Sequence, residues 1–207
     1  MSEPIELIVG LGNPGSRYAD TRHNAGWWFV DELANKYGGI FREQAKFFGE
    51  MAEIVVANQR LRLLKPLTYM NESGRSVAAV AKFYRYAPSQ LLVAHDELDL
   101  PAGVARLKVG GGHGGHNGLR DLISALGADF WRLRLGIDHP GQRSEVTDYV
   151  LRRASAAEEA LTRSAIDEAI GVIPTLLTQG EQRAKTALHT RTKPIRPDAE
   201  TGAGANE

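Results

Sequence analysis

The sequence contains no cysteine, no long apolar run and no net charge. Without cysteine there can be no disulfide framework, no thiolate nucleophile and no zinc–thiolate site. Apolar runs such as WWFV at 27–30 are far shorter than the ~20 residues that a membrane span requires. The N-terminus lacks the basic and apolar regions of a signal peptide. We therefore expect a soluble cytoplasmic protein that does not act at a membrane.

The chain has 207 residues, of which 43% are hydrophobic, enough for one domain with a proper core. Its 25 Lys and Arg residues balance 25 Asp and Glu residues, so a globally basic nucleic-acid binder is excluded. Segment 104–154 is locally basic, with eight Lys or Arg against five Asp or Glu. That excess is either a patch that attracts a polyanion or ordinary scatter, and charge alone leaves both open.

Short apolar runs alternate with amphipathic stretches along most of the chain. Strands are predicted at 5–11, in a hairpin over 51–66, and at 91–95, 103–109 and 131–137; helices are predicted at 23–39, 71–86 and 117–127 and from a capping box at 155–158. This order predicts an α/β fold, a single-domain three-layer sandwich with a mixed, mostly parallel sheet flanked by helices. Residues 1–190 form the domain, and 191–207 read as a disordered tail because apolar periodicity is lost there.

GLGNPG at 10–15 follows a strand and matches the glycine spacing of dinucleotide-binding loops. In those loops the glycines lead directly into a helix whose N-terminus binds the pyrophosphate. Here an Asn-Pro-Gly turn intervenes and the loop continues to about Arg22. We therefore expect no dinucleotide and no other cofactor.

His23 and Asp96 are the strongest candidates for chemistry. His23 lies at the start of a predicted helix, where the partial positive charge disfavours an imidazolium and favours a neutral general base. Asp96 follows a buried strand, where a carboxylate can accept the Nδ1–H of a histidine. Taken separately, a surface histidine beside a helix cap and an aspartate capping a turn remain alternatives.

Metal and serine chemistry fit the pattern less well. His95, Asp96, His113 and His116 offer nitrogen and oxygen ligands, but adjacent strand residues point to opposite faces and no further ligand is obvious. Ser76 in GRSVA falls one turn inside a predicted helix, whereas a nucleophile elbow requires a strand leading directly into the serine. We expect neither a metal site nor an acyl-serine intermediate.

Four stretches together resemble the bacterial-type peptidyl-tRNA hydrolases. They are LIVGLGNPGSRYADTRHNAGWWFVDELA, LLKPLTYMNESGRSV, LLVAHDELDLPAGVARLKVGGGHGGHNGLRDLISALG and WRLRLGIDHPG, in order between about residues 5 and 188. The resemblance implies a monomeric, metal-independent enzyme that hydrolyses the ester between a peptide and the 3′-terminal ribose of tRNA. It would recycle peptidyl-tRNA left by aborted translation.

The resemblance also implies roles for individual residues. His23 falls on the catalytic base, Asp96 on the carboxylate that orients it, and Asn13 on the residue that helps to distinguish N-blocked peptidyl groups. Positions that contact the substrate or line the same cleft are Tyr18, Tyr69, Met70, Asn71, His116 and Asn117, and those that clamp the tRNA 5′ phosphate are Lys108 and Arg134. His116 is expected to position other groups rather than act as a second base.

Two other functions compete with hydrolysis of peptidyl-tRNA. A non-catalytic RNA-binding module on the same fold would bind tRNA without cleaving it, although it has no evident need for His23, Asp96 and three asparagines. A metal phosphohydrolase would lose its activity to a chelator.

Overall fold

The computed structural model describes residues 3–192, and the predicted tail is outside it from residue 193 onward. Within this part of the chain the strands form one seven-stranded sheet, in the order β2-β3-β4-β1-β5-β7-β6. The strands are β1 (Leu7–Gly10), β2 (Arg42–Gln44), β3 (Gly49–Val56), β4 (Gln59–Pro66), β5 (Leu91–Glu97), β6 (Ala105–Val109) and β7 (Trp131–Gly136). The four central strands are parallel, and both edges add antiparallel strands.

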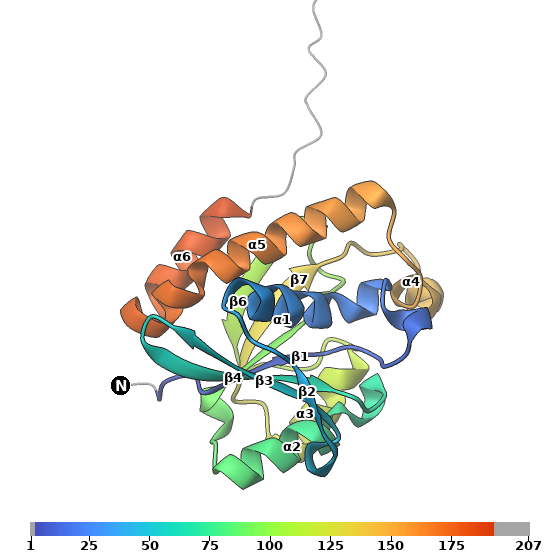
Figure 1. Ribbon diagram of the computed structural model, residues 1–207. Coiled ribbons are helices and arrows are strands. Elements are labelled where there is room, and N and C mark those ends of the chain that lie inside the picture. Colours follow the sequence, from blue (N-terminus) through green and yellow to red (C-terminus); the bar gives the residue numbers. More distant parts are fainter. Residues whose placement is uncertain (1–2, 193–207) are drawn as a thin grey trace, which may run out of the picture.

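Helices cover both faces of this sheet. They are α1 (Ala25–Lys36), α2 (Ser73–Tyr84), α3 (Asn117–Leu126), α4 (Val146–Val150), α5 (Ala156–Gln179) and α6 (Glu181–Arg191). Helices α1, α5 and α6 lie on one face, and α2 and α3 lie on the other (Figure 1). The three-layer sandwich with a mixed sheet is therefore confirmed. No described helix combines the length and the apolar character needed to cross a membrane.

Close backbone packing holds α1 against the sheet. A Cβ added to Gly10 would lie 2.3 Å from the carbonyl oxygen of Gly26, and one added to Gly26 would lie 2.4 Å from that of Ala94. These approaches are possible only without side chains, so the two glycines set the start of α1 against the ends of β1 and β5.

The predicted first helix begins differently from the expectation. His23 lies in a short 3-10 turn, Arg22–Asn24, and α1 starts only at Ala25. The hairpin is confirmed, with Ala57 and Asn58 both at positive φ in the two-residue turn that matches strand twist. The capping box at Ser155 and Glu158 is also confirmed as the start of α5.

Candidate active site

A cleft of about 970 Å³ opens at the carboxyl ends of β1 and β5. Nine of the predicted site residues line it: Asn13, Tyr18, His23, Tyr69, Met70, Asn71, Asp96, His116 and Asn117. They come from the β1 loop, the turn before α1, the segment before α2, the end of β5 and the start of α3. The fold thus brings together residues that are far apart in the sequence, where open α/β sheets commonly bind ligands.

A buried hydrogen bond joins His23 to Asp96. The Nδ1 atom of His23 lies 2.9 Å and 3.0 Å from the two carboxylate oxygens of Asp96. Burial alone would raise the pKa of the Asp96 carboxyl, but attraction and hydrogen bonds from His23 and His116 hold that pKa well below its usual range. An ionised carboxylate can only accept hydrogen bonds, so Nδ1 of His23 carries the proton. In a neutral ring, Nε2 is then left with its lone pair.

His116 is fixed at both of its ring nitrogens. Its Nε2 lies 2.9 Å from Oδ1 of Asp96 and must donate there, for the same reason as Nδ1 of His23. Its Nδ1 accepts the backbone N–H of Leu119 and so caps α3. Because both nitrogens are already engaged, His116 holds the Asp96 carboxylate and the start of α3, in keeping with the expected positioning role.

His95 also lines the cleft, with 1% of its surface exposed. Burial and the neighbouring His116 lower the pKa of its imidazole to about 3, so the ring is neutral at physiological pH. Its Nδ1 donates to the main-chain oxygen of Asp96 at 2.7 Å. His95 therefore supports the end of β5 without adding a positive charge beside Asp96.

Within residues 3–192, the group that could offer three metal ligands consists of His23, Asp96 and His116. One ligand atom from each lies within 4.8 Å of the others. His95 and His113, which the sequence had also suggested, do not belong to this group. Since the hydrogen bonds to Asp96 already account for the close approach of the three residues, no ion is needed to explain it.

Asn13 is held by two partners that leave its NH₂ group for other contacts. Its side-chain oxygen accepts the backbone N–H of Met70 at 2.8 Å. Its own backbone N–H and C=O bond to the buried Asn24 side chain, at 2.9 Å and 3.0 Å. Asn24 thus fastens the β1 loop to the turn that carries His23, a role that the sequence analysis missed.

Lys108 and Arg134 lie on the β6–β7 edge and are not among the described residues that line the cleft. The register pairs Arg106 with Arg134 and Lys108 with Arg132, so all four cationic side chains project from one face of the sheet. Nε of Arg134 forms an ion pair with Glu97 at 2.8 Å, and Lys108 is exposed. Four of the eight basic residues of segment 104–154 are therefore gathered on one face, but Arg132 is buried and Arg134 is paired, which leaves Lys108 as the exposed cation of this group.

Arg132 supports the glycine loop between β6 and α3. It is 3% exposed, and its guanidinium donates to the carbonyl oxygens of Gly111 and Gly112. Gly110, Gly111, Gly114 and Gly115 all have positive φ, which explains the glycine content of the loop. This buried arginine was also missed, because only its alternation in a strand could be read from the sequence.

The fold and the cleft define the class: an α/β enzyme with a carboxylate–histidine pair at the carboxyl edge of its sheet. The family model described as Peptidyl-tRNA hydrolase matches residues 7–196, so the chain belongs to the peptidyl-tRNA hydrolase family. It is 54% identical over 192 residues to peptidyl-tRNA hydrolases of Vibrio parahaemolyticus and Tolumonas auensis, covering 92% of this chain and 98% of each relative. The crystal structure of peptidyl-tRNA hydrolase from Acinetobacter baumannii is 52% identical, with a TM-score of 0.86 over 89% of this chain and 94% of that one.

Proposed function

We propose that this chain hydrolyses the ester bond between the peptide and the 3′-terminal ribose of peptidyl-tRNA, with His23 as the general base. The observation that carries the assignment of the base is the 2.9 Å contact between Nδ1 of His23 and the buried Asp96 carboxylate. It leaves the basic nitrogen, Nε2, on a ring that lines the cleft. Membership of the family supports the substrate and its products, free tRNA and an N-blocked peptide.

The reaction needs a base, a site for negative charge and an acid for the leaving group. Nε2 of His23 takes a proton from water as the water oxygen attacks the ester carbonyl. Asp96 stabilises the imidazolium that results. The free NH₂ of Asn13 donates to the developing oxyanion. The imidazolium then returns its proton to the ribose oxygen as the carbon–oxygen bond breaks, so no acyl-enzyme forms.

The remaining predicted residues are assigned to substrate binding. Asn71 and Asn117 are exposed at the cleft and offer both donors and acceptors, while Tyr18, Tyr69 and Met70 contribute rings and a thioether. Neutral amides can hold the peptide backbone without pairing with Asp96 and reducing its hold on His23. Tyr69 is 54% exposed, so its ring is available for stacking against the 3′-terminal base or the peptide.

The function is tested with N-acetylaminoacyl-tRNA as substrate and unblocked aminoacyl-tRNA as control, each with and without a chelator. We expect release of free tRNA from the blocked substrate only, at the same rate with and without chelator. Binding without cleavage would support the RNA-binding module instead. Loss of activity to the chelator would contradict the metal-independent mechanism. Monomeric state and cytoplasmic location remain predictions.

The basic face of the β6–β7 edge gives a prediction about tRNA affinity. Lys108→Ala is expected to weaken tRNA binding and to reduce the slope of log Kd against log salt by about one unit, because one phosphate contact is lost. Binding would be measured by fluorescence anisotropy between about 50 and 200 mM salt. Lys36→Ala, at an exposed position on α1, is the matched control. An unchanged slope for Lys108→Ala would remove this residue from the tRNA interface.

A further inference from the structure

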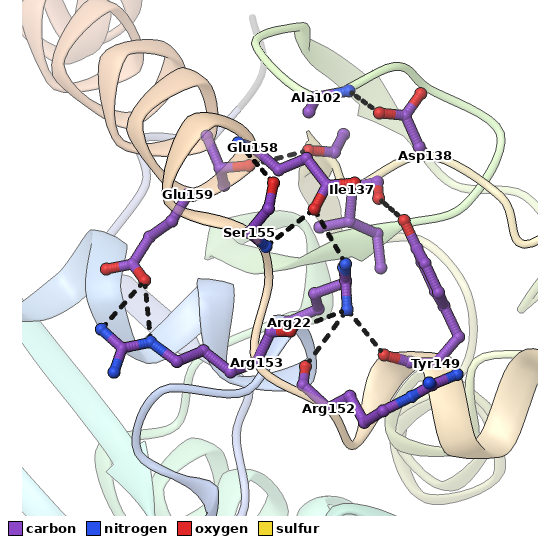
Figure 2. A network of polar contacts seen from close by, with 12 residues as sticks. Arg22, Ala102, Ile137, Asp138, Tyr149, Arg152, Arg153, Ser155, Glu158 and Glu159 are labelled. Atoms are coloured by element: carbon purple, nitrogen blue, oxygen red, sulfur yellow. Dashed lines mark hydrogen bonds and ion pairs between the residues drawn. The ribbon is translucent and has the colours of Figure 1, made fainter.

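Arg22, the residue before His23, is buried beneath a segment more than a hundred residues further along the chain. It is 8% exposed. One terminal nitrogen of its guanidinium donates to the main-chain oxygens of Tyr149, Arg152 and Arg153, at 3.2, 3.4 and 3.2 Å. The other donates to Glu158 at 2.9 Å (Figure 2). Tyr149 lies in the last turn of α4, and Arg152 and Arg153 follow that helix. Arg22 therefore donates to the main chain at and just beyond the C-terminal end of α4.

Further contacts tie the same two segments together. The Arg22 guanidinium lies over the Tyr149 ring, 4.0 Å from its centroid. The hydroxyl of Tyr149 donates to the main-chain oxygen of Ile137 at 2.6 Å, next to the end of β7 (Figure 2). The backbone N–H of Arg22 bonds to the oxygen of Arg152, and Thr21 pairs with Arg153 in an antiparallel bridge. The C-terminal end of α4, at Tyr149, and the segment that follows it are therefore held from two directions, by the Arg22 turn and by the end of β7.

Glu158 anchors this arrangement to α5. Burial would raise the pKa of its carboxyl, but hydrogen bonds from Ser155 and the attraction of Arg22 outweigh burial and lower it. The carboxylate is therefore ionised at neutral pH and bonds at once to Arg22 and to the backbone N–H of Ser155. Arg22 makes four hydrogen bonds through the two terminal nitrogens of its planar guanidinium. No other side chain could replace it without losing several of them.

The segment that Arg22 holds forms one wall of the active-site cleft. Val146, Val150 and Leu151 line the cleft and are apolar, so they can contribute to binding but cannot transfer a proton. His23 has its own supports on the other side of its turn, because Asp96 and the Asn13–Asn24 bonds hold it there. Loss of the Arg22 contacts should therefore release the wall while the base remains in place.

We propose that Arg22 is a positioning residue that sets the α4 wall of the cleft against the substrate. The inference rests on the proposed function, since it assigns the wall to binding of peptidyl-tRNA. A positioning role and a purely structural role affect different kinetic constants. A partly unfolded variant would lose active enzyme and so lower kcat at an unchanged KM, whereas a displaced wall raises KM.

The test compares Arg22→Met with the wild type and with Arg152→Met. Methionine keeps an unbranched side chain that fills the inner part of the same space, and it removes every donor. We expect KM for N-acetylaminoacyl-tRNA to rise about 10- to 100-fold, with kcat within about 2-fold, since binding is lost but the chemistry is not. Arg152→Met changes the same segment but removes only a bond to the Asp148 oxygen, so it should behave as the wild type. Arg22→Lys should raise KM less than Arg22→Met does and more than Arg152→Met does.

Hydrogen exchange provides the second readout, and Tyr149→Leu the second variant. In Arg22→Met, faster exchange is expected over 138–154 and not in the central strands of the sheet. Tyr149→Leu leaves no buried charge without a partner, so it remains informative if Arg22→Met fails to fold. It should raise KM in the same direction but less. Unchanged KM in both variants of an active enzyme would overturn the proposal, whereas a wild type that cleaves nothing would overturn the proposed function itself.

Discussion

Replacing His23 with alanine is expected to lower kcat for peptidyl-tRNA hydrolysis by about 10²–10⁴-fold, the usual contribution of a positioned base. His23 combines a hydrogen bond to an ionised, buried carboxylate with a free lone pair on its other ring nitrogen. Without the imidazole, no other side chain of the described cleft has that combination. Affinity for tRNA should be nearly unchanged, because His23 is 7% exposed and offers little surface to the nucleic acid. Single-turnover cleavage and binding to uncleavable tRNA measure the two effects separately.

Two comparisons distinguish loss of the base from loss of structure. His23→Asn keeps an amide donor toward Asp96 and should be as inactive as the alanine variant, because an amide cannot accept the proton from water. Added imidazole should restore part of the activity of His23→Ala, since the space of the side chain is left open beside Asp96. Turnover of His23→Ala near the wild-type level would exclude the base assignment.

The fold and the pairing of His23 with Asp96 could be predicted from the sequence because both depend on local patterns. A buried strand followed by a carboxylate, and a histidine next to the first helix, can be recognised without knowing the rest of the chain. Parallel strands then bring their carboxyl ends to one edge, so Asp96 and His23 meet there. The loop at 110–115 has four glycines at positive φ, a conformation that its glycine-rich sequence permits.

The contacts that hold the site could not be predicted, because their partners are distant in sequence. Asn24 bonds to the backbone of Asn13, 11 residues earlier, and Arg22 reaches carbonyls 127 to 131 residues later. Neither side chain has a periodicity or spacing that would indicate its partner. The sequence analysis also missed the short helix α4, because five residues give too little pattern and its contact with Arg22 spans more than a hundred residues of sequence.

His116 illustrates a prediction that the structure makes specific. The sequence suggested a positioning role without saying what it positions. In the structure one ring joins the Asp96 carboxylate to the first turn of α3, where Asn117 is the first residue. The same carboxylate oxygen therefore receives two histidine donors. Movement of the glycine loop would displace one of them, His116, and so change the hydrogen bonding of Asp96.

Replacing Asp96 with asparagine is expected to lower kcat by about 10³–10⁴-fold, although the side chain keeps its shape. Both carboxylate oxygens lie within hydrogen-bonding distance of Nδ1 of His23, and one of them also receives His116. If the amide oxygen takes the place of Oδ1 and keeps the His116 donor, the amide NH₂ takes the place of Oδ2 and faces Nδ1 of His23, donor to donor. The imidazole then moves its proton to Nε2 and loses the lone pair that activates water.

The pH–rate profile and a matched variant separate this explanation from a loss of stability. Residual activity of Asp96→Asn should extend to lower pH than that of the wild type, because no carboxylate then stabilises the imidazolium. Asp138→Asn is the control: its carboxylate accepts the backbone N–H of Ala102 at 3.1 Å, which an amide oxygen can also do. Asp138 has positive φ, a conformation that asparagine tolerates, so the fold should be unaffected. Equal loss of activity in both variants would show that removal of any carboxylate is harmful, and that Asp96 does not act by fixing the tautomer of His23.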